Sequence, residues 1–313
     1  MKPTEFWKNF RLGDEVSVSG TFIYNGLRRY HEMQKLDYSD EIFEFLYNLS
    51  VGFERLLKIA VVLFEHNETI NQEALEKSLI THNHLELLAR LRKHVDINFG
   101  SPQIDLLCLF GRFYKSYRYD RFSLNSVFEG KKEIKALCEL LSKHLDLDIN
   151  SSPSMLGIMN EDRYKKFIHR NCLKISRKLY EIIKERARNI NLYTYELRGW
   201  SKAESVFLRE VKITDEDVLW KELLIFFMNT KSSSGYLDFL RGIEPLEFDP
   251  GLIDDYLCAF KSDASKVSVM DELEHHYSEM EGDIGKRLEV MEVIGAHNVL
   301  FEFDDEELLE GEE

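Results

Sequence analysis

One segment of the sequence alternates cationic with aromatic side chains. Its cations recur at every third position with rings between them: Arg112, Lys115, Arg118 and Arg121, interleaved with Phe113, Tyr114, Tyr117 and Tyr119. Lys and Arg bind phosphates and aromatic rings stack on bases, so this pattern is typical of a surface that contacts nucleic acid. Three-residue spacing turns about 60° per step on a helix and spreads the cations over half its circumference. The alternative is a solvated helix face with tyrosines packed beneath it.

A histidine elsewhere adds a group that exchanges protons near neutral pH. Cleavage of RNA without a metal needs a base for the 2′-hydroxyl and a cation for the charge that develops on the phosphate. His82 and Arg118 are residues of the right types. The alternative is structural, with His82 or His84 capping the helix that begins near residue 84. The packed polar partner across the bundle is then Glu54 or Lys58.

A long helix expected at residues 163–188 has a charge opposite to that of the whole chain. It holds ten Lys or Arg and two acidic residues, whereas the sequence has a net charge of −15. This helix could bind nucleic acid, or it could contact the acidic stretch at 302–313 in the same chain. Attraction between exposed charges is screened beyond about 8 Å at physiological salt, so the second alternative requires direct contact. A freely solvated tail is a further alternative.

Helices must position all of these side chains. Apolar residues recur at three- and four-residue intervals in several segments, which cover residues 21–33, 39–67, 72–80, 85–94, 104–117 and 132–144. Glycine and proline are scarce, at 16 and 5 residues, and this favours long regular elements. We therefore expect a mainly all-α protein that begins with a bundle of about five or six helices.

The stretch at residues 146–154 has no periodicity and contains a proline, so it predicts a domain boundary. We expect a helical bundle at 1–150, a second helical domain at 151–301 and an acidic tail at 302–313. The second domain should contain several helices and one β-hairpin: helices near 163–188, 216–228, 236–240, 252–260 and 267–280, and a hairpin at 288–303.

Composition limits the classes of function. Hydrophobic residues make up 44% and charged residues 31% of the 313 residues, a balance typical of folded proteins. The longest apolar run, 59–64, is too short for a membrane span of roughly 20 residues, and no signal-like run follows the first residues. We expect a cytoplasmic protein. The four cysteines are scattered and no phosphate loop, zinc pattern or nucleophile elbow occurs, so no metal or cofactor is expected.

Three short motifs follow one another in the first half of the chain. They are Glu54 with Lys58 four residues later, the run His82-Asn83-His84-Leu85, and Arg118 followed by Tyr119. Their order resembles the HEPN superfamily, in which a Glu-x-x-x-Lys helix, a His-x-x-Leu helix and a terminal Arg-Tyr segment recur in a small helical bundle. The resemblance covers about residues 20–145. It implies a homodimer that forms through the bundle.

Nuclease members of that superfamily carry an Arg, four to six intervening residues and then a His, often with a polar residue directly after the Arg. One pair here has that spacing, Arg163 and His169. Tyr164 stands in place of the polar residue, and the pair lies outside the region of resemblance. The candidate catalytic residues are therefore His82, Arg118, Arg163 and His169.

Functions from different classes remain open. Many HEPN members are RNA-cleaving toxins or abortive-infection proteins, so the resemblance implies a prokaryotic antiviral-defence or toxin-type protein that cleaves RNA without a metal. The alternative is a non-catalytic interaction or scaffold subunit that binds a protein partner, which the acidic charge favours. A third alternative is a nucleotide-binding sensor.

Overall fold

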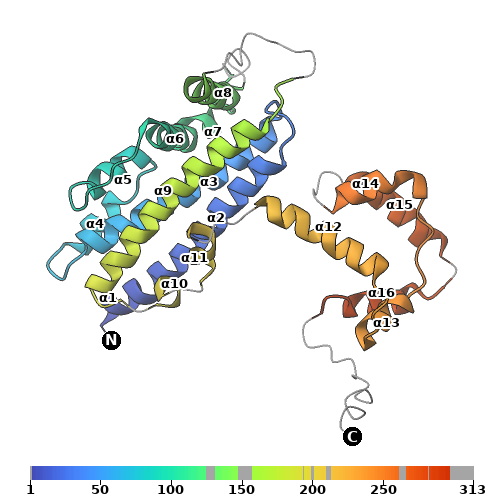
Figure 1. Cartoon of the computed structure of the whole chain (residues 1–313). Coiled ribbons are helices and arrows are strands. Elements are labelled where there is room, and N and C mark those ends of the chain that lie inside the picture. Colours follow the sequence, from blue (N-terminus) through green and yellow to red (C-terminus); the bar gives the residue numbers. More distant parts are fainter. Residues whose placement is uncertain are drawn as a thin grey trace, which may run out of the picture. The chain divides into compact units, whose positions relative to one another are not determined.

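The computed structural model of the chain is built from helices (Figure 1). It describes residues 2–124, 131–146, 157–192, 194–198, 201–208, 213–260, 266–280 and 282–296. These residues form no β-strand, so the mainly all-α class expected from the sequence is confirmed. Within the same residues, no helix combines the length and the apolar character that crossing a membrane requires. The chain divides into two compact units, Met1–Asp217 and Val218–Glu313.

Two long helices form the centre of the first unit. They are α2, at Leu12–Glu32, and α3, at Ser39–Glu65, and they follow a short α1, at Pro3–Phe6, and a π-helical turn at Trp7–Arg11. Glycines let α2 and α3 approach closely, since a Cβ atom at Gly26 would lie 2.7 Å from the Leu49 side chain. A Cβ atom at Gly52 would lie 2.6 Å from the Ile23 side chain. Glu54 and Lys58 lie on α3, and the close packing of α3 against α2 fixes the position of their backbone.

Helix α9, at Asp162–Asn189, packs against both α2 and α3. Its buried apolar residues recur at helical spacing and include Ile168, Cys172, Ile175, Leu179 and Ile183. Two short helices, α10 at Tyr195–Arg198 and α11 at Lys202–Phe207, then lie against α2. Because the bundle core buries the apolar face of α9, the structure has its division after Asp217 and not near residue 150. Residues 147–156, which include most of the stretch that indicated a boundary, lie outside the described residues.

A further layer of helices covers α3 (Figure 1). It consists of α4 at Gln72–Ser78, α5 at His84–Leu91, α6 at Ser101–Arg112 and α8 at Lys132–Leu145. Between α6 and α8 the chain forms a π-helical turn at Phe113–Tyr117 and then α7 at Arg118–Asp120. Single π-helical turns inside helices often occur at functional sites. The turn here carries Tyr114 toward the residues that precede α5.

The second unit is also helical. Helix α12, at Ile213–Asn229, begins with the last residues of the first unit and continues into the second. It is followed by α13 at Gly235–Arg241, a 3₁₀ turn at Pro250–Leu252, α14 at Ile253–Ala259, α15 at Lys266–Glu279 and α16 at Ile284–Val293. The prediction of a hairpin at 288–303 is wrong for its first strand, because those residues begin within helix α16. The side chain of Asp283 caps this helix and accepts from the backbone N–H of Lys286. Residues 297–303 and the acidic tail lie outside the described residues.

Candidate functional site

His82 lies just before α5 and bonds to α3. Its Nδ1 is 2.9 Å from Oε2 of Glu54, and its side chain is 43% exposed. Neither His82 nor His84 caps α5, since the capping side chain is that of Asn83, which accepts from the backbone N–H of Glu86. His82 is therefore held by a side-chain bond to another helix and keeps an exposed edge.

Glu54 binds both His82 and Lys58. Its carboxylate is buried, and its other oxygen, Oε1, accepts from Nζ of Lys58 at 2.6 Å. A buried carboxylate needs such partners, because an unpaired charge inside a protein is costly. An ionised Glu54 accepts the Nδ1 proton of a neutral His82, and this tautomer leaves the second ring nitrogen, Nε2, with its lone pair.

Tyr114 connects His82 to Arg118. The rings of His82 and Tyr114 meet edge to face with centroids 4.6 Å apart, and the Arg118 guanidinium carbon lies 3.7 Å from the centroid of the Tyr114 ring. Burial raises the pKa of the Tyr114 hydroxyl above its ordinary value. A histidine, a tyrosine and an arginine thus lie in one chain of contacts.

Arg118 keeps its charge free of acidic neighbours. Its guanidinium lies 4.5 Å from the centroid of the Tyr119 ring, and its Nη2 donates to the Tyr119 hydroxyl at 2.6 Å. Within the described residues it forms no ion pair, and its buried Nε has no hydrogen-bond acceptor. A cation held by rings rather than by a carboxylate retains its capacity to bind a phosphate.

The other cations of the alternating segment separate from this cluster, as their spacing indicated. Arg121 pairs with the buried carboxylate of Glu133 and donates to the Ser39 carbonyl, so it fastens α8 to the start of α3. Its assignment as a nucleic-acid contact is not supported by this geometry, because its charge is already compensated. Arg112 and Lys115 are exposed.

The pair Arg163 and His169, selected by spacing alone, does not form a joint site. Arg163 bonds to its neighbour Glu161, with Nε 2.8 Å from Oε2, and its guanidinium lies 5.2 Å from the Tyr164 ring. His169 lines two pockets, and Arg163 lines neither of them. Six residues along one helix turn through about 600°, which leaves the two side chains on different sides of α9.

His84 has a structural role. It is fully buried, its Nε2 lies 2.8 Å from the Ser50 carbonyl, and burial lowers its pKa below the ordinary value. A histidine that stays neutral and donates to a backbone carbonyl ties α5 to α3. It thereby helps to place His82, two residues earlier, within reach of Glu54.

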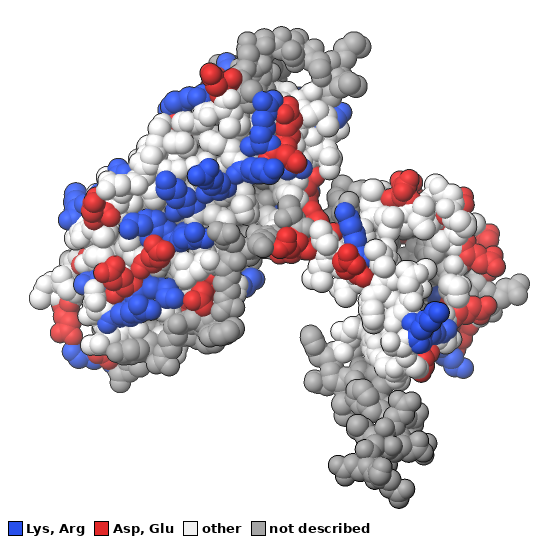
Figure 2. All heavy atoms as spheres, viewed as in Figure 1, with Lys and Arg blue, Asp and Glu red and all other residues white. Residues whose placement is uncertain are grey.

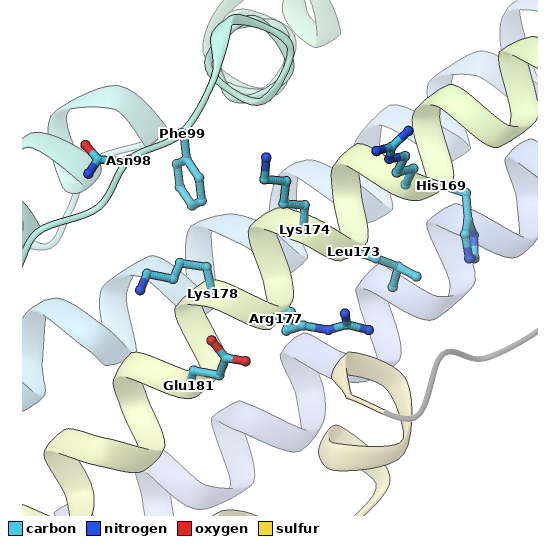
Figure 3. A pocket seen from close by; sticks show the side chains of 9 residues that line it. Asn98, Phe99, His169, Leu173, Lys174, Arg177, Lys178 and Glu181 are labelled. Carbon is cyan, nitrogen blue, oxygen red and sulfur yellow. The ribbon is translucent and has the colours of Figure 1, made fainter.

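A groove of about 570 Å³ along α9 was not predicted from the sequence. Its lining combines a loop before α6 with one face of α9 (Figure 3): Asn98, Phe99, His169, Arg170, Leu173, Lys174, Arg177, Lys178 and Glu181. The recurrence of Arg170, Lys174 and Lys178 at four-residue spacing was the available signal. The contribution of Phe99 depends on how the helices pack, and local patterns do not reveal it.

The described residues hold no group of three or more His, Cys, Asp or Glu side chains placed to bind a metal ion. Comparisons with protein families, with curated proteins and with solved structures found no match to this chain.

Proposed function

We propose that this protein is a HEPN-like ribonuclease of a prokaryotic defence or toxin-type system, with His82 as its general base and Arg118 as its phosphate-binding cation. One observation carries the proposal. His82 is oriented by the buried carboxylate of Glu54 and lies against Tyr114, whose ring also supports an Arg118 without an acidic partner. An oriented histidine beside an uncompensated arginine is the pair that phosphodiester cleavage by an internal hydroxyl requires.

The reaction follows from the roles of these groups. Nε2 of His82 takes the proton of the ribose 2′-hydroxyl, the 2′-oxygen forms a bond to phosphorus, and the bond from phosphorus to the 5′-oxygen breaks. The leaving 5′-oxygen takes a proton from solvent, so the products are a 2′,3′-cyclic phosphate and a 5′-hydroxyl. Glu54 stabilises the imidazolium through Nδ1, and Arg118 binds the phosphate oxygens on which negative charge accumulates.

The test is a cleavage assay on a fluorophore-quencher RNA in the presence of a metal chelator. We expect His82→Ala to lower the rate by about 10² to 10⁴-fold, because a positioned base contributes that much. Arg118→Ala should lower it by about 10² to 10³-fold, as the loss of one charge-stabilising donor does. Arg163→Ala and His275→Ala serve as matched controls, since Arg163 is bound to Glu161 and His275 lies on α15. Full activity of the His82 variant would refute the proposal.

A non-catalytic interaction subunit is the second candidate, and helix α12 favours it. Its apolar residues from Val218 onward are exposed in the structure and include Leu219, Leu223, Ile225, Phe226, Phe227 and Met228. A helix that is apolar around most of its circumference is usually enclosed by other protein. Light scattering coupled to gel filtration separates the candidates. The interaction function predicts an assembly larger than one chain that Phe226→Asp with Phe227→Asp dissociates, together with no RNA cleavage by the wild type.

Homodimerisation is part of the ribonuclease proposal. The same light-scattering experiment should give twice the mass of one chain, and a substitution on α12 should leave that mass unchanged if the bundle forms the interface. A single-chain mass for an active wild type would remove the dimer from the proposal.

A further inference from the structure

Four exposed cations follow one another along α9. Lys166, Arg170, Lys174 and Lys178 recur at every fourth position. Each step of four residues rises about 6 Å and turns about 40°, so the four positions cover about a third of the helix circumference over about 18 Å. Figure 2 shows Lys and Arg side chains gathered along this helix. The row therefore presents regularly spaced positive charges to solvent.

These cations are not compensated within the part of the chain that the structure describes, where Arg170, Lys174 and Lys178 form no ion pair or hydrogen bond. Other cations of the same helix do have partners: Lys184 pairs with Glu204 at 3.3 Å, and Arg186 donates to the Leu63 carbonyl at 3.0 Å. The one acidic side chain that lines the groove is Glu181, at its end. Uncompensated like charges in a row repel one another, and an external polyanion relieves that repulsion.

The opposite wall of the groove supplies an aromatic ring. Phe99 is partly buried against the core, and Figure 3 shows its ring pointing from the loop before α6 toward the part of α9 that carries Lys174 and Lys178. Asn98 lies beside it in the same lining. A ring next to a row of cations is the arrangement by which proteins hold single-stranded nucleic acid, with bases stacked and phosphates paired.

We propose that the groove along α9 binds the backbone of single-stranded RNA, with phosphates on Arg170, Lys174 and Lys178 and one base stacked on Phe99. This inference rests on the proposed ribonuclease function for its choice of RNA, and it names the substrate class as single-stranded. A duplex keeps its bases inside the helix, so it cannot place one on Phe99. An acidic peptide would use the cations but not the ring.

The groove and His82 lie at opposite ends of α6. Phe99 precedes the first residue of α6, Ser101, whereas Gly111 near its other end packs on His84, next to His82. The 12 residues of α6 span about 18 Å. An RNA strand of several nucleotides is long enough to span this separation, whereas a dinucleotide is not.

The experiment measures binding of a fluorescein-labelled 12-nucleotide RNA to the full chain by anisotropy at several salt concentrations. All proteins carry His82→Ala, so cleavage does not disturb the measurement. Adding Arg170→Ala, Lys174→Ala and Lys178→Ala should reduce the slope of log affinity against log salt by about 2, because each phosphate that a protein neutralises on a single strand contributes about 0.7 to that slope. Lys77→Ala, Lys135→Ala and Lys231→Ala remove the same charge at exposed positions outside the groove and should leave the slope near that of the parent.

Phe99 separates nucleic acid from other polyanions. Phe99→Leu retains an apolar side chain and removes the ring face, and it should weaken binding by about tenfold, whereas Phe99→Tyr should bind like the parent. Equal slopes for the two triple variants, or equally effective competition by polyglutamate or by duplex RNA of the same length, would overturn the inference. If His82 proves non-catalytic, the binding result still stands, whereas failure of the groove leaves the cleavage of a dinucleotide by the wild type unaffected.

Discussion

Replacement of Glu54 by Gln tests whether this buried carboxylate sets the state of His82. The wild-type carboxylate accepts from Lys58 at Oε1, at 2.6 Å, and lies 2.9 Å from Nδ1 of His82 at Oε2. Glutamine has nearly the same shape but only one oxygen. Because Lys58 can only donate, the amide oxygen must face Lys58 and the amide NH₂ must face His82.

The histidine then has to change its tautomer. Nδ1 becomes the acceptor, so the proton of the neutral ring moves to Nε2, the atom that should act as the base. The loss of the carboxylate also removes the stabilisation of the imidazolium. Because loss of the carboxylate that orients a catalytic histidine can cost up to about 10⁴-fold, we expect about 10² to 10⁴-fold here. Lys58 keeps its hydrogen bond, so the loss of folding free energy should stay below about 3 kcal/mol.

Single-turnover cleavage with excess enzyme measures this effect without interference from product release. Glu65→Gln is the matched control, since Glu65 is another carboxylate of α3, paired with Arg90 and about 16 Å further along the helix. It should cleave at the wild-type rate. A folded Glu54→Gln variant that binds RNA and cleaves within threefold of the wild type would refute the role assigned to Glu54.

Two further predictions concern stability. Gly52→Ala should destabilise the protein by about 1–2 kcal/mol in urea unfolding, because overpacking outweighs the gain in helix propensity. The new Cβ would meet the Ile23 side chain at 2.6 Å and the Ile23 backbone nitrogen at 3.1 Å. A more stable variant would contradict the close α2–α3 contact. Burial acts to raise the pKa of Asp105, but hydrogen bonds from Lys143 and His144 outweigh it and leave that pKa below its ordinary value. The stabilisation is therefore present above the unfolded pKa of about 4 and is lost as pH falls through the lower folded value. Asp105→Asn should thus lower the melting temperature more at pH 7 than at pH 3.

Much of the helical architecture could be predicted from the sequence. The three- and four-residue rhythm of apolar residues identified α3 and α9, because burial of one helix face imposes that period. The domain boundary could not be located in the same way. Helix α9 carries so many cations that it resembles an exposed element, while its buried face, with Cys172 and Leu179, completes the core of the first unit.

The candidate site was predictable in its residue types and not in its pairings. The sequence offered Glu54 or Lys58 as the polar partner of His82 or His84, and only the structure shows that Glu54 bonds to Nδ1 of His82. Spacing along one helix selected Arg163 with His169, yet side chains at that separation lie on different sides of α9. Residues from separate segments, such as Phe99 in the loop before α6 and Lys174 on α9, come together only through packing, and no periodicity in the sequence contains that information.

Mass spectrometry of the products from a synthetic RNA tests the assignment of His82 most directly. With a chelator present, the wild type should convert the RNA to fragments that end in a 2′,3′-cyclic phosphate, and an RNA with a 2′-deoxyribose at the cleaved position should remain intact. His82→Ala should yield no such fragments over the same time. Cyclic-phosphate products from the His82 variant at the wild-type rate, or cleavage of the deoxy-substituted RNA, would contradict the account.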